Sequence, residues 1–326
     1  MDRRYIDIED SDTLVLRSDG APAPGPEEVL IAVDFAGVNR ADVLQRLGLY
    51  PVPEDASPIM GLEVSGTVVD AGKDIRRFKT GDKVCALVHG GGYASHAIAR
   101  EDHTFLLPAG LTTRDGAALP EALLTVWHNV FNLGNLQPGS SLLIHGGSSG
   151  IGTMGVQMGL AFGAKVIATA GGEQKCQRVR ELGAEFVADY RAGDLAQQID
   201  TAGYKGKIDV ILDIAGGDFV AVNLDLAAPD ARIVCIGVMR GAKAEIDLFQ
   251  ILMKRLTVTG STVRGMGIAG RADGFRAIED LVLPWLSGQR VVPIIDTVWP
   301  LADAMEAQQT MQSGVHFGKL LLDCRA

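Results

Sequence analysis

The sequence predicts an α/β fold, with a doubly wound parallel sheet and a second, mostly antiparallel β domain. Between residues 145 and 260, short apolar runs alternate with helix-like segments, which is typical of a parallel sheet covered on both faces. Between residues 27 and 110, strand-like runs are separated by tight turns instead, which favours antiparallel pairing in a partly open barrel. We expect residues 119–262 to form the parallel Rossmann domain, and residues 1–118 with 263–326 to form the second, catalytic domain.

The parallel domain begins with the apolar run Leu142–Ile144, a glycine-serine turn and a helix-like segment from Met154. A helix N-terminus offers free N–H groups and the positive end of the helix dipole, and small residues let a pyrophosphate approach closely. The turn reads G-x-S-G-I-G, with Ser149 where the dinucleotide fingerprint usually has glycine. The predicted phosphate-binding residues are Gly147, Ser148, Ser149, Gly150 and Ile151.

The segments that follow continue the alternation in order. Strands are expected at residues 165–169, 185–189, 209–213, 232–236 and 256–260, with an amphipathic helix at 173–182 closed by Gly183. Glycine turns lie at the carboxyl ends of these strands, which is the edge where doubly wound sheets bind ligands. Gly171 and Gly237, with Val238 and Met239 beside it, are therefore predicted to contact the cofactor.

The end of the second strand carries no acidic residue. An NAD site usually has one there to bind the ribose 2′-hydroxyl, whereas this chain has Thr169-Ala-Gly-Gly172. Lys175 and Tyr190 lie nearby in sequence, and an ammonium and a phenol can bind a 2′-phosphate. The pattern favours NADPH, although Lys175 can also be read as an ordinary solvated helix lysine.

Composition narrows the classes of partner. A net charge of −10 argues against general binding to nucleic acid or to anionic membranes. No apolar run approaches the ~20 residues of a membrane span, and the acidic start does not resemble a signal peptide. The isolated Cys85, Cys176, Cys235 and Cys324 predict a reducing, cytoplasmic location.

Several short motifs, taken together, resemble the medium-chain dehydrogenase/reductase superfamily across essentially the whole chain. The similarity is closest to its zinc-independent, zeta-crystallin-like quinone oxidoreductases, one branch of which also has serine at the position of Ser149. The segments that carry the resemblance are Gly37–Asp42, Gly48–Pro51, Gly61–Gly66, Gly81–Val84, Leu119–Glu121 with Thr125–Trp127, and Gly314–Lys319.

The resemblance implies that no metal is bound. Zinc-dependent relatives hold cysteine and histidine where this chain has Asn39 and Arg40, and histidine where it has Leu62. Zinc requires three or four converging N, S or O donors, and the six histidines show no metal-ligand spacing. We therefore expect hydride transfer without a Lewis acid.

The resemblance also implies an activity, namely NADPH-dependent reduction of a quinone or activated carbonyl. It places Asn39, Tyr50 and Thr125 around the nicotinamide, with Tyr50 at the substrate oxygen, or merely packed beside the neighbouring prolines. No Ser-Tyr-x-x-x-Lys set and no Walker sequence occurs. Two alternatives stay open: an NADPH-dependent enoyl or alkenal reductase, and an NADPH-binding protein with little turnover. A homodimer or homotetramer is expected from the relatives.

Overall fold

The computed structural model describes residues 1–325, which form two compact units. Unit 1 contains residues 1–122, 275–287 and 293 onward, and unit 2 contains residues 123–274 and 288–292. Among the described residues, every helix is too short or too polar to cross a bilayer.

Unit 2 is built on a six-stranded sheet in which all strands run parallel. The strands are β8 (Ser141–Ile144), β9 (Lys165–Ala170), β10 (Phe186–Asp189), β11 (Ile208–Asp213), β12 (Ala227–Cys235) and β13 (Thr257–Gly260). Their spatial order is β10-β9-β8-β11-β12-β13, so the strand order reverses between β8 and β11. This confirms the doubly wound α/β class and puts the ligand-binding switch point at the carboxyl ends of these two strands.

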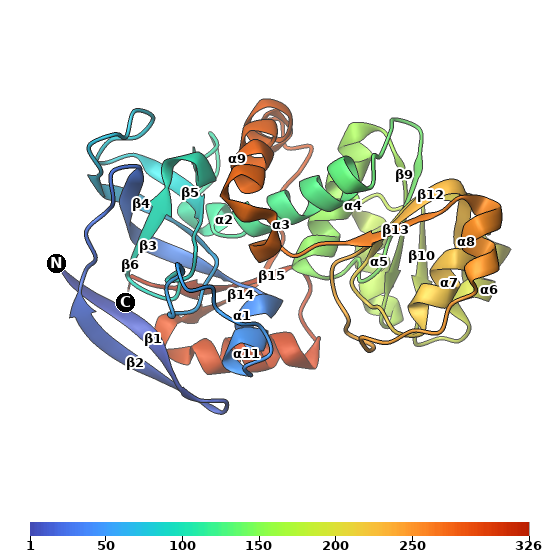
Figure 1. Cartoon of the computed structure of the whole chain (residues 1–326), viewed down its shortest axis with the longest axis horizontal. Coiled ribbons are helices and arrows are strands. Elements are labelled where there is room, and N and C mark those ends of the chain that lie inside the picture. The colour runs from blue at the N-terminus through green and yellow to red at the C-terminus, as the bar shows by residue number, and fades with distance from the viewer. Residues whose placement is uncertain (326) are drawn as a thin grey trace. The chain divides into compact units, whose positions relative to one another are not determined.

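Helices cover both faces of this sheet because its strands are apolar on both sides, with Leu143, Ile167 and Ile211 buried in one core. Figure 1 shows α6, α7 and α8 gathered on one side and α4 on the other. The helices are α4 (Gly150–Phe162), α5 (Glu173–Glu181), α6 (Leu195–Thr201), α7 (Phe219–Leu226) and α8 (Leu248–Lys254). The helical segments α3 (Pro120–Val126), η2 (Trp127–Leu133), η3 (Arg264–Met266) and α9 (Gly267–Ala277) complete the set.

Unit 1 contains a seven-stranded, mostly antiparallel sheet that stays open rather than closing into a barrel. Its strands are β3 (Glu28–Val38), β4 (Glu63–Ala71), β5 (Lys83–Leu87), β6 (His96–Arg100), β7 (Thr104–Leu106), β14 (Ile295–Pro300) and β15 (Lys319–Asp323). The last strand in the chain is β15, which runs antiparallel to β3 and parallel to β14.

A hairpin that the sequence did not predict precedes this sheet. Strands β1 (Asp2–Asp10) and β2 (Thr13–Gly20) form a two-stranded sheet in which mainly Ile6 is buried, and a bridge from Tyr5 to Ala94 ties β1 to the segment before β6. The short helix α2 (Thr113–Gly116) is capped by Thr112, whose hydroxyl accepts a hydrogen bond from the Asp115 N–H. The remaining helices are α1 (Arg40–Arg46), η1 (Glu101–His103), η4 (Ile278–Val282), α10 (Leu283–Ser287), η5 (Leu301–Asp303) and α11 (Ala304–Ser313).

Candidate functional site

The five predicted phosphate-binding residues lie where β8 leads into α4, with Gly147, Ser148 and Ser149 in the turn and Gly150 and Ile151 at the start of the helix. Ser149 is the N-cap of α4, and its hydroxyl oxygen accepts a hydrogen bond of 2.9 Å from the N–H of Gly152. Serine is a favoured N-cap residue, which gives a physical reason for the departure from glycine at this position. The turn brings small residues and a helix N-terminus to the carboxyl edge of the sheet.

Two glycines, one in this turn and one in the first turn of α4, leave no room for a side chain. A Cβ atom at Gly152 would overlap the backbone carbonyl of Gly146, and one at Gly147 would lie 2.9 Å from the Cβ of Ala168. Because the first obstacle is backbone, it cannot rotate away as a side chain can. The turn is therefore a cradle whose small size suits the close approach of a pyrophosphate.

The ends of β9 and β10 bring Gly171 and Tyr190 together. A Cβ at Gly171 would overlap the phenol oxygen of Tyr190, whose side chain is 38% exposed. Gly172 has a φ of 93°, and its N–H donates to Asp189 Oδ1 at 2.9 Å. The same carboxylate oxygen accepts the N–H of Arg191 at 2.9 Å, so it is bonded to the turn itself.

Arg191 is a residue of this site that sequence reasoning missed. Its Nε lies 3.0 Å from the position that a Gly171 Cβ would take, and its side chain is exposed. Lys175 is half-buried in the first turn of α5, where its backbone N–H donates to the Gly172 carbonyl at 3.1 Å. The only signal in the sequence is that Arg191 directly follows Tyr190.

The turn after β12 contains the predicted residues Gly237, Val238 and Met239. A Cβ at Gly237 would lie 2.7 Å from the carbonyl oxygen of Ile214, so this turn passes close to the end of β11. The Met239 N–H donates to the same carbonyl at 3.3 Å. The side chains of Val238 and Met239 are exposed, and they are therefore available to a ligand at this edge.

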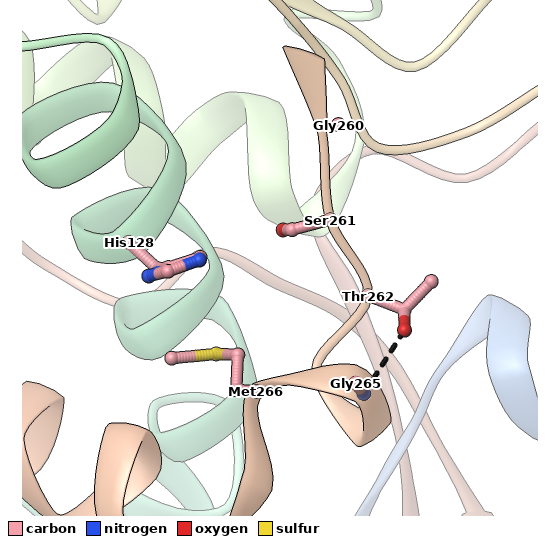
Figure 2. Close-up of a pocket in the computed structure, with 6 residues that line it drawn as sticks. All are labelled: His128, Gly260, Ser261, Thr262, Gly265 and Met266. Carbon is pink, nitrogen blue, oxygen red and sulfur yellow. Dashed lines mark hydrogen bonds between the residues drawn. The ribbon is translucent and has the colours of Figure 1, made fainter.

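A pocket of about 310 Å³ lies past the carboxyl end of β13, within unit 2. Figure 2 shows its lining residues, which are His128, Gly260, Ser261, Thr262, Gly265 and Met266. Burial lowers the pKa of His128 below its ordinary value, so its imidazole is neutral at pH 7. The pocket thus offers a neutral imidazole and small polar groups at the sheet edge that binds ligands.

The predicted residue Thr125 is joined to this pocket through Asn129. Thr125 is 5% exposed, and its carbonyl accepts a hydrogen bond of 2.8 Å from Asn129 Nδ2. Asn129 Oδ1 in turn accepts the Ser261 hydroxyl at 2.7 Å. The structure therefore connects Thr125 with the residues after β13.

In unit 1, a charged cluster of Asn39, Glu63, Glu121 and Lys319 joins four distant segments. The ammonium of Lys319 lies 2.5 Å from Glu63 Oε1, 2.6 Å from Asn39 Oδ1 and 3.8 Å from Glu121 Oε2. Burial lowers the pKa of Lys319, but Glu63 and Glu121 outweigh it and raise the pKa above its ordinary value. Lys319 therefore stays positively charged in the interior, beside the carboxyl groups of Glu63 and Glu121.

This cluster engages the whole side chain of Asn39, which is 5% exposed. Its oxygen accepts from Lys319, and its Nδ2 donates to Glu63 Oε1 at 2.9 Å. The catalytic role predicted for Asn39 stays a prediction, since these bonds by themselves describe a structural role. Tyr50, the other predicted catalytic residue, lies half-buried in the irregular segment after α1.

Asp42 is a second buried carboxylate close to this cluster. It accepts hydrogen bonds from the Asn39 N–H at 2.8 Å, the Tyr93 hydroxyl at 3.1 Å and the Gly61 N–H at 3.2 Å. Burial raises the pKa of Asp42 to about 6 despite these bonds. Burial and the nearby Asp42 carboxyl likewise raise the pKa of Tyr93 well above its ordinary value.

The positions compared with zinc ligands hold Asn39, half-buried Arg40 and buried Leu62. Among residues 1–325, no three or more His, Cys, Asp or Glu side chains are grouped so that they could hold a metal ion. Zinc independence stays a prediction, because the identity of these residues does not test whether the activity requires zinc.

Two family models match the chain, one in each half. Residues 25–113 match the alcohol dehydrogenase GroES-like domain, and residues 150–281 match the zinc-binding dehydrogenase family.

Curated relatives of two kinds are similar to the chain. Quinone oxidoreductase of Rattus norvegicus is 30% identical over 323 residues, which cover 98% of this chain and 96% of the rat protein. A mycocerosic acid synthase-like polyketide synthase of Mycobacterium tuberculosis is 31% identical over 308 residues. These residues cover 92% of this chain but only 14% of that much longer protein.

Solved structures show the same arrangement over nearly the full length. Escherichia coli quinone oxidoreductase complexed with NADPH has a TM-score of 0.87 and 26% identity, covering 99% of this chain and 100% of that one. CurK enoyl reductase has a TM-score of 0.85 and 25% identity, covering 98% of this chain and 99% of that one.

Proposed function

We propose that this chain reduces quinones with NADPH, since it belongs to the zeta-crystallin-like quinone oxidoreductase family of the medium-chain dehydrogenase/reductase superfamily. Members of this superfamily are oxidoreductases, and the chain is therefore an oxidoreductase with a nicotinamide cofactor. The observation that carries this proposal is the carboxyl edge of the unit 2 sheet. That edge combines a cradle of small residues with Tyr190 and Arg191 beside Gly171, and with Lys175 in the first turn of α5. The substrate is a small quinone or activated carbonyl. Four free cysteines support a reducing, cytoplasmic setting.

The preference for NADPH over NADH rests on the ends of β9 and β10. A 2′-phosphate would meet the ammonium of Lys175, the guanidinium of Arg191 and the phenol of Tyr190. The Asp189 carboxylate already accepts two backbone N–H groups through Oδ1. Charge-assisted bonds contribute ~1.5–3 kcal/mol each, or roughly 10–150-fold in affinity.

This preference is measured as the dissociation constants of NADPH and NADH by fluorescence titration. We expect NADPH to bind at least about tenfold more tightly, and Lys175→Ala or Arg191→Ala to remove much of that difference. Lys165→Ala, at the exposed start of β9, is the matched control. Equal constants in the wild-type protein would rule out the proposal for this site.

The pocket after β13 is proposed to serve the nicotinamide half of the cofactor. In a doubly wound sheet each half holds one nucleotide, and β13 belongs to the half opposite β9 and β10. When bound, the reduced nicotinamide supplies a hydride to the acceptor. Thr125, Asn129 and Ser261 hold the wall of this pocket through their hydrogen bonds.

Proton delivery is assigned to Tyr50, whose phenol would hydrogen-bond the acceptor oxygen. A reduced quinone oxygen is stabilised by aromatisation and can take its proton from water. We therefore expect Tyr50→Phe to reduce quinone turnover only modestly and to leave the NADPH dissociation constant unchanged. Loss of quinone turnover to background in a folded Tyr50→Phe protein would contradict the quinone mechanism, in which water can supply the proton.

Reduction of an activated C=C bond is the second candidate, supported by the similarity to CurK enoyl reductase. An enolate is more basic than a hydroquinone oxygen, so a positioned acid contributes more, typically ~10²–10⁴-fold. Steady-state rates on quinones, enones and enoyl thioesters separate the two candidates. Tight NADPH binding without turnover of any acceptor would favour the third possibility, a binding protein.

Zinc-independent chemistry is proposed because Arg40 and Leu62 cannot coordinate a metal and Asn39 is bonded to the Lys319 ammonium. Purified protein should therefore contain no stoichiometric zinc, and a chelator should leave activity unchanged. One tightly held zinc per chain that is lost together with activity would contradict this.

We also propose that the chain forms a homodimer or homotetramer through β13 and α8. Strand β13 is an edge strand, and α8 has no buried residue, with Leu252 exposed at 73%. Leu248, Phe249 and Met253 extend this apolar face. Light scattering should show an oligomer that Leu252→Asp dissociates and that Leu281→Asp, an exposed control, does not. A wild-type monomer would refute the proposal.

A further inference from the structure

Four polar residues form a buried relay beneath the carboxyl edge of the unit 2 sheet. They are His145, Thr169, Asp213 and Asn223, and each is at most 1% exposed. His145 follows β8, Thr169 lies in β9, Asp213 ends β11 and Asn223 lies in α7. The relay therefore lies where the strand order reverses, yet none of these side chains has a role in the proposed chemistry.

One half of the relay holds the phosphate turn. Thr169 Oγ1 accepts the N–H of Gly146 at 3.2 Å and lies 3.2 Å from His145 Nδ1. The carbonyl of Gly146 accepts the N–H of Ser149 at 2.9 Å, and Gly152 packs directly against that carbonyl. The position of Gly146 consequently sets the path of the predicted phosphate cradle.

The other half holds the turn after β11. Asn223 Nδ2 donates to Asp213 Oδ2 at 2.9 Å. Asp213 Oδ1 accepts the N–H groups of Ala215 at 2.7 Å and Gly216 at 3.0 Å. The Ala215 carbonyl then accepts the Arg240 N–H at 2.8 Å, which fixes the turn containing Val238 and Met239.

His145 joins the two halves, and its bonds define one pattern of protons. His145 Nε2 lies 2.6 Å from Asn223 Oδ1. Because an amide oxygen only accepts, Nε2 carries the hydrogen and Nδ1 is free to accept the Thr169 hydroxyl. Burial lowers the pKa of His145 although Asp213 opposes this, and a neutral imidazole satisfies every group in the relay.

We propose that His145, Thr169, Asn223 and Asp213 act as positioning residues that hold the turns after β8 and β11 in the geometry that binds the cofactor. The relay spans the switch point, so it couples the turn on the phosphate side to the turn on the nicotinamide side. The expected change in NADPH affinity rests on the proposed function. The expected change in amide hydrogen exchange does not, because it is measured on the protein without cofactor.

Thr169→Val is the test of the first half, because it removes the hydroxyl with little change in shape. We expect the NADPH dissociation constant to rise about tenfold, with kcat at saturating NADPH within about twofold of wild type. In the cofactor-free protein, the amides of residues 146–152 should exchange hydrogen faster. Thr169→Ser keeps the hydroxyl, so its NADPH affinity and amide exchange should match those of the wild type. Thr257→Val, in exposed β13, is the matched control.

His145→Asn tests the link and remains informative if Thr169→Val does not fold. Its shorter amide can reach Thr169 but not Asn223, so we expect faster exchange at residues 213–217 and weaker NADPH binding. Wild-type affinity and exchange in both variants would overturn the proposal. A wild-type protein that binds no NADPH would instead reject the cofactor assignment, and the exchange data would still test the relay.

Discussion

Unit 1 and unit 2 organise their functional polar groups in different ways. In unit 2, the cradle residues Gly147, Ser149 and Gly152 lie within one short stretch of sequence at the start of α4, and helix capping and lack of space account for their identity. In unit 1, the charged cluster assembles residues as far apart as Asn39 and Lys319 around a buried ammonium. A turn can be recognised from a short stretch of sequence, whereas a cluster of this kind exists only once the sheet has formed.

The two arrangements also differ in what a single substitution removes. A buried ion pair is expensive to break, because the remaining charge stays desolvated without its partner. A crowded glycine turn responds to added volume instead, and it can relax partly by shifting the backbone. Substitutions in the charged cluster should therefore act mainly on stability, and those in the cradle mainly on ligand binding.

The largest expected effect is that of Lys319→Met. It leaves the buried Glu63 carboxylate without its cation, so the free energy of unfolding should fall by about 3–5 kcal/mol. Denaturant unfolding followed by fluorescence measures this change. Lys165→Met, at the exposed start of β9, serves as the control and should change little. A loss below about 1 kcal/mol would mean that the two units do not differ as described.

Gly152→Ala should have the next largest effect, and chiefly on binding. The added methyl overlaps the Gly146 carbonyl, so stability should fall by ~1–3 kcal/mol and NADPH affinity by more than about tenfold. Gly155→Ala is the matched control on the same helix, since its Cβ would meet only side-chain atoms of Ile144 and Val126. Equal NADPH affinity in the two variants would show that the cradle tolerates a side chain.

A smaller effect should appear in the pH dependence of unit 1. The pKa of Asp42 is raised from 3.8 to about 6, so the folded state binds this proton more tightly than the unfolded chain does. The resulting stabilisation is fully present below about pH 4 and is lost as the pH rises through about 6. Relative to Asp42→Asn, the wild-type protein should lose roughly 1–3 kcal/mol across this window.

Thermal or denaturant unfolding at closely spaced pH values measures this difference. The variant has its own constant offset, because an amide cannot accept all of the bonds made by Asp42, so only the change with pH is informative. A difference between the two proteins that stays constant from pH 4 to pH 7 would contradict the raised pKa.

The smallest effect is expected for an ion pair on the surface of unit 2. Arg240 lies 2.5 Å from Asp218, and both side chains are largely exposed. Asp218→Asn should therefore lower the free energy of unfolding by less than about 1 kcal/mol. A loss comparable to that of Lys319→Met would remove the distinction between buried and exposed pairs on which the comparison depends.

Much of unit 2 could be predicted from sequence because its strands are continuous apolar runs that end in glycine turns. Strands β9, β10, β11 and β13 lie within two residues of their predicted positions, whereas β12 begins earlier, at Ala227. The early part of β12 is not a clean apolar run, since Pro229 and Asp230 interrupt it. The apolar pattern therefore predicted only the second half of this strand, from residue 232.

Unit 1 was less predictable because parts of it lack such continuous apolar runs. The hairpin β1–β2 buries little more than Ile6, so it lacks the apolar pattern of a core strand. Glu63 and Lys319 each lie in a motif that carries the family resemblance, but nothing in the sequence around either residue indicates that the two side chains meet. Arg191 was missed because a basic residue after a strand is ordinary until its distance from Gly171 is known.

The position of β15 beside β3 has a consequence for how the chain assembles during translation. Strand β3 is made early, but β15, which pairs with it, emerges only after nearly all of the described chain. At synthesis rates of ~5–20 residues per second, this part of β3 waits roughly 15–60 s for its partner. The sheet of unit 2 needs nothing beyond β13 and can form in the meantime. The seven-stranded sheet of unit 1 is thus started before the sheet of unit 2 and finished after it, and until β15 arrives the free edge of β3 is open to mispairing.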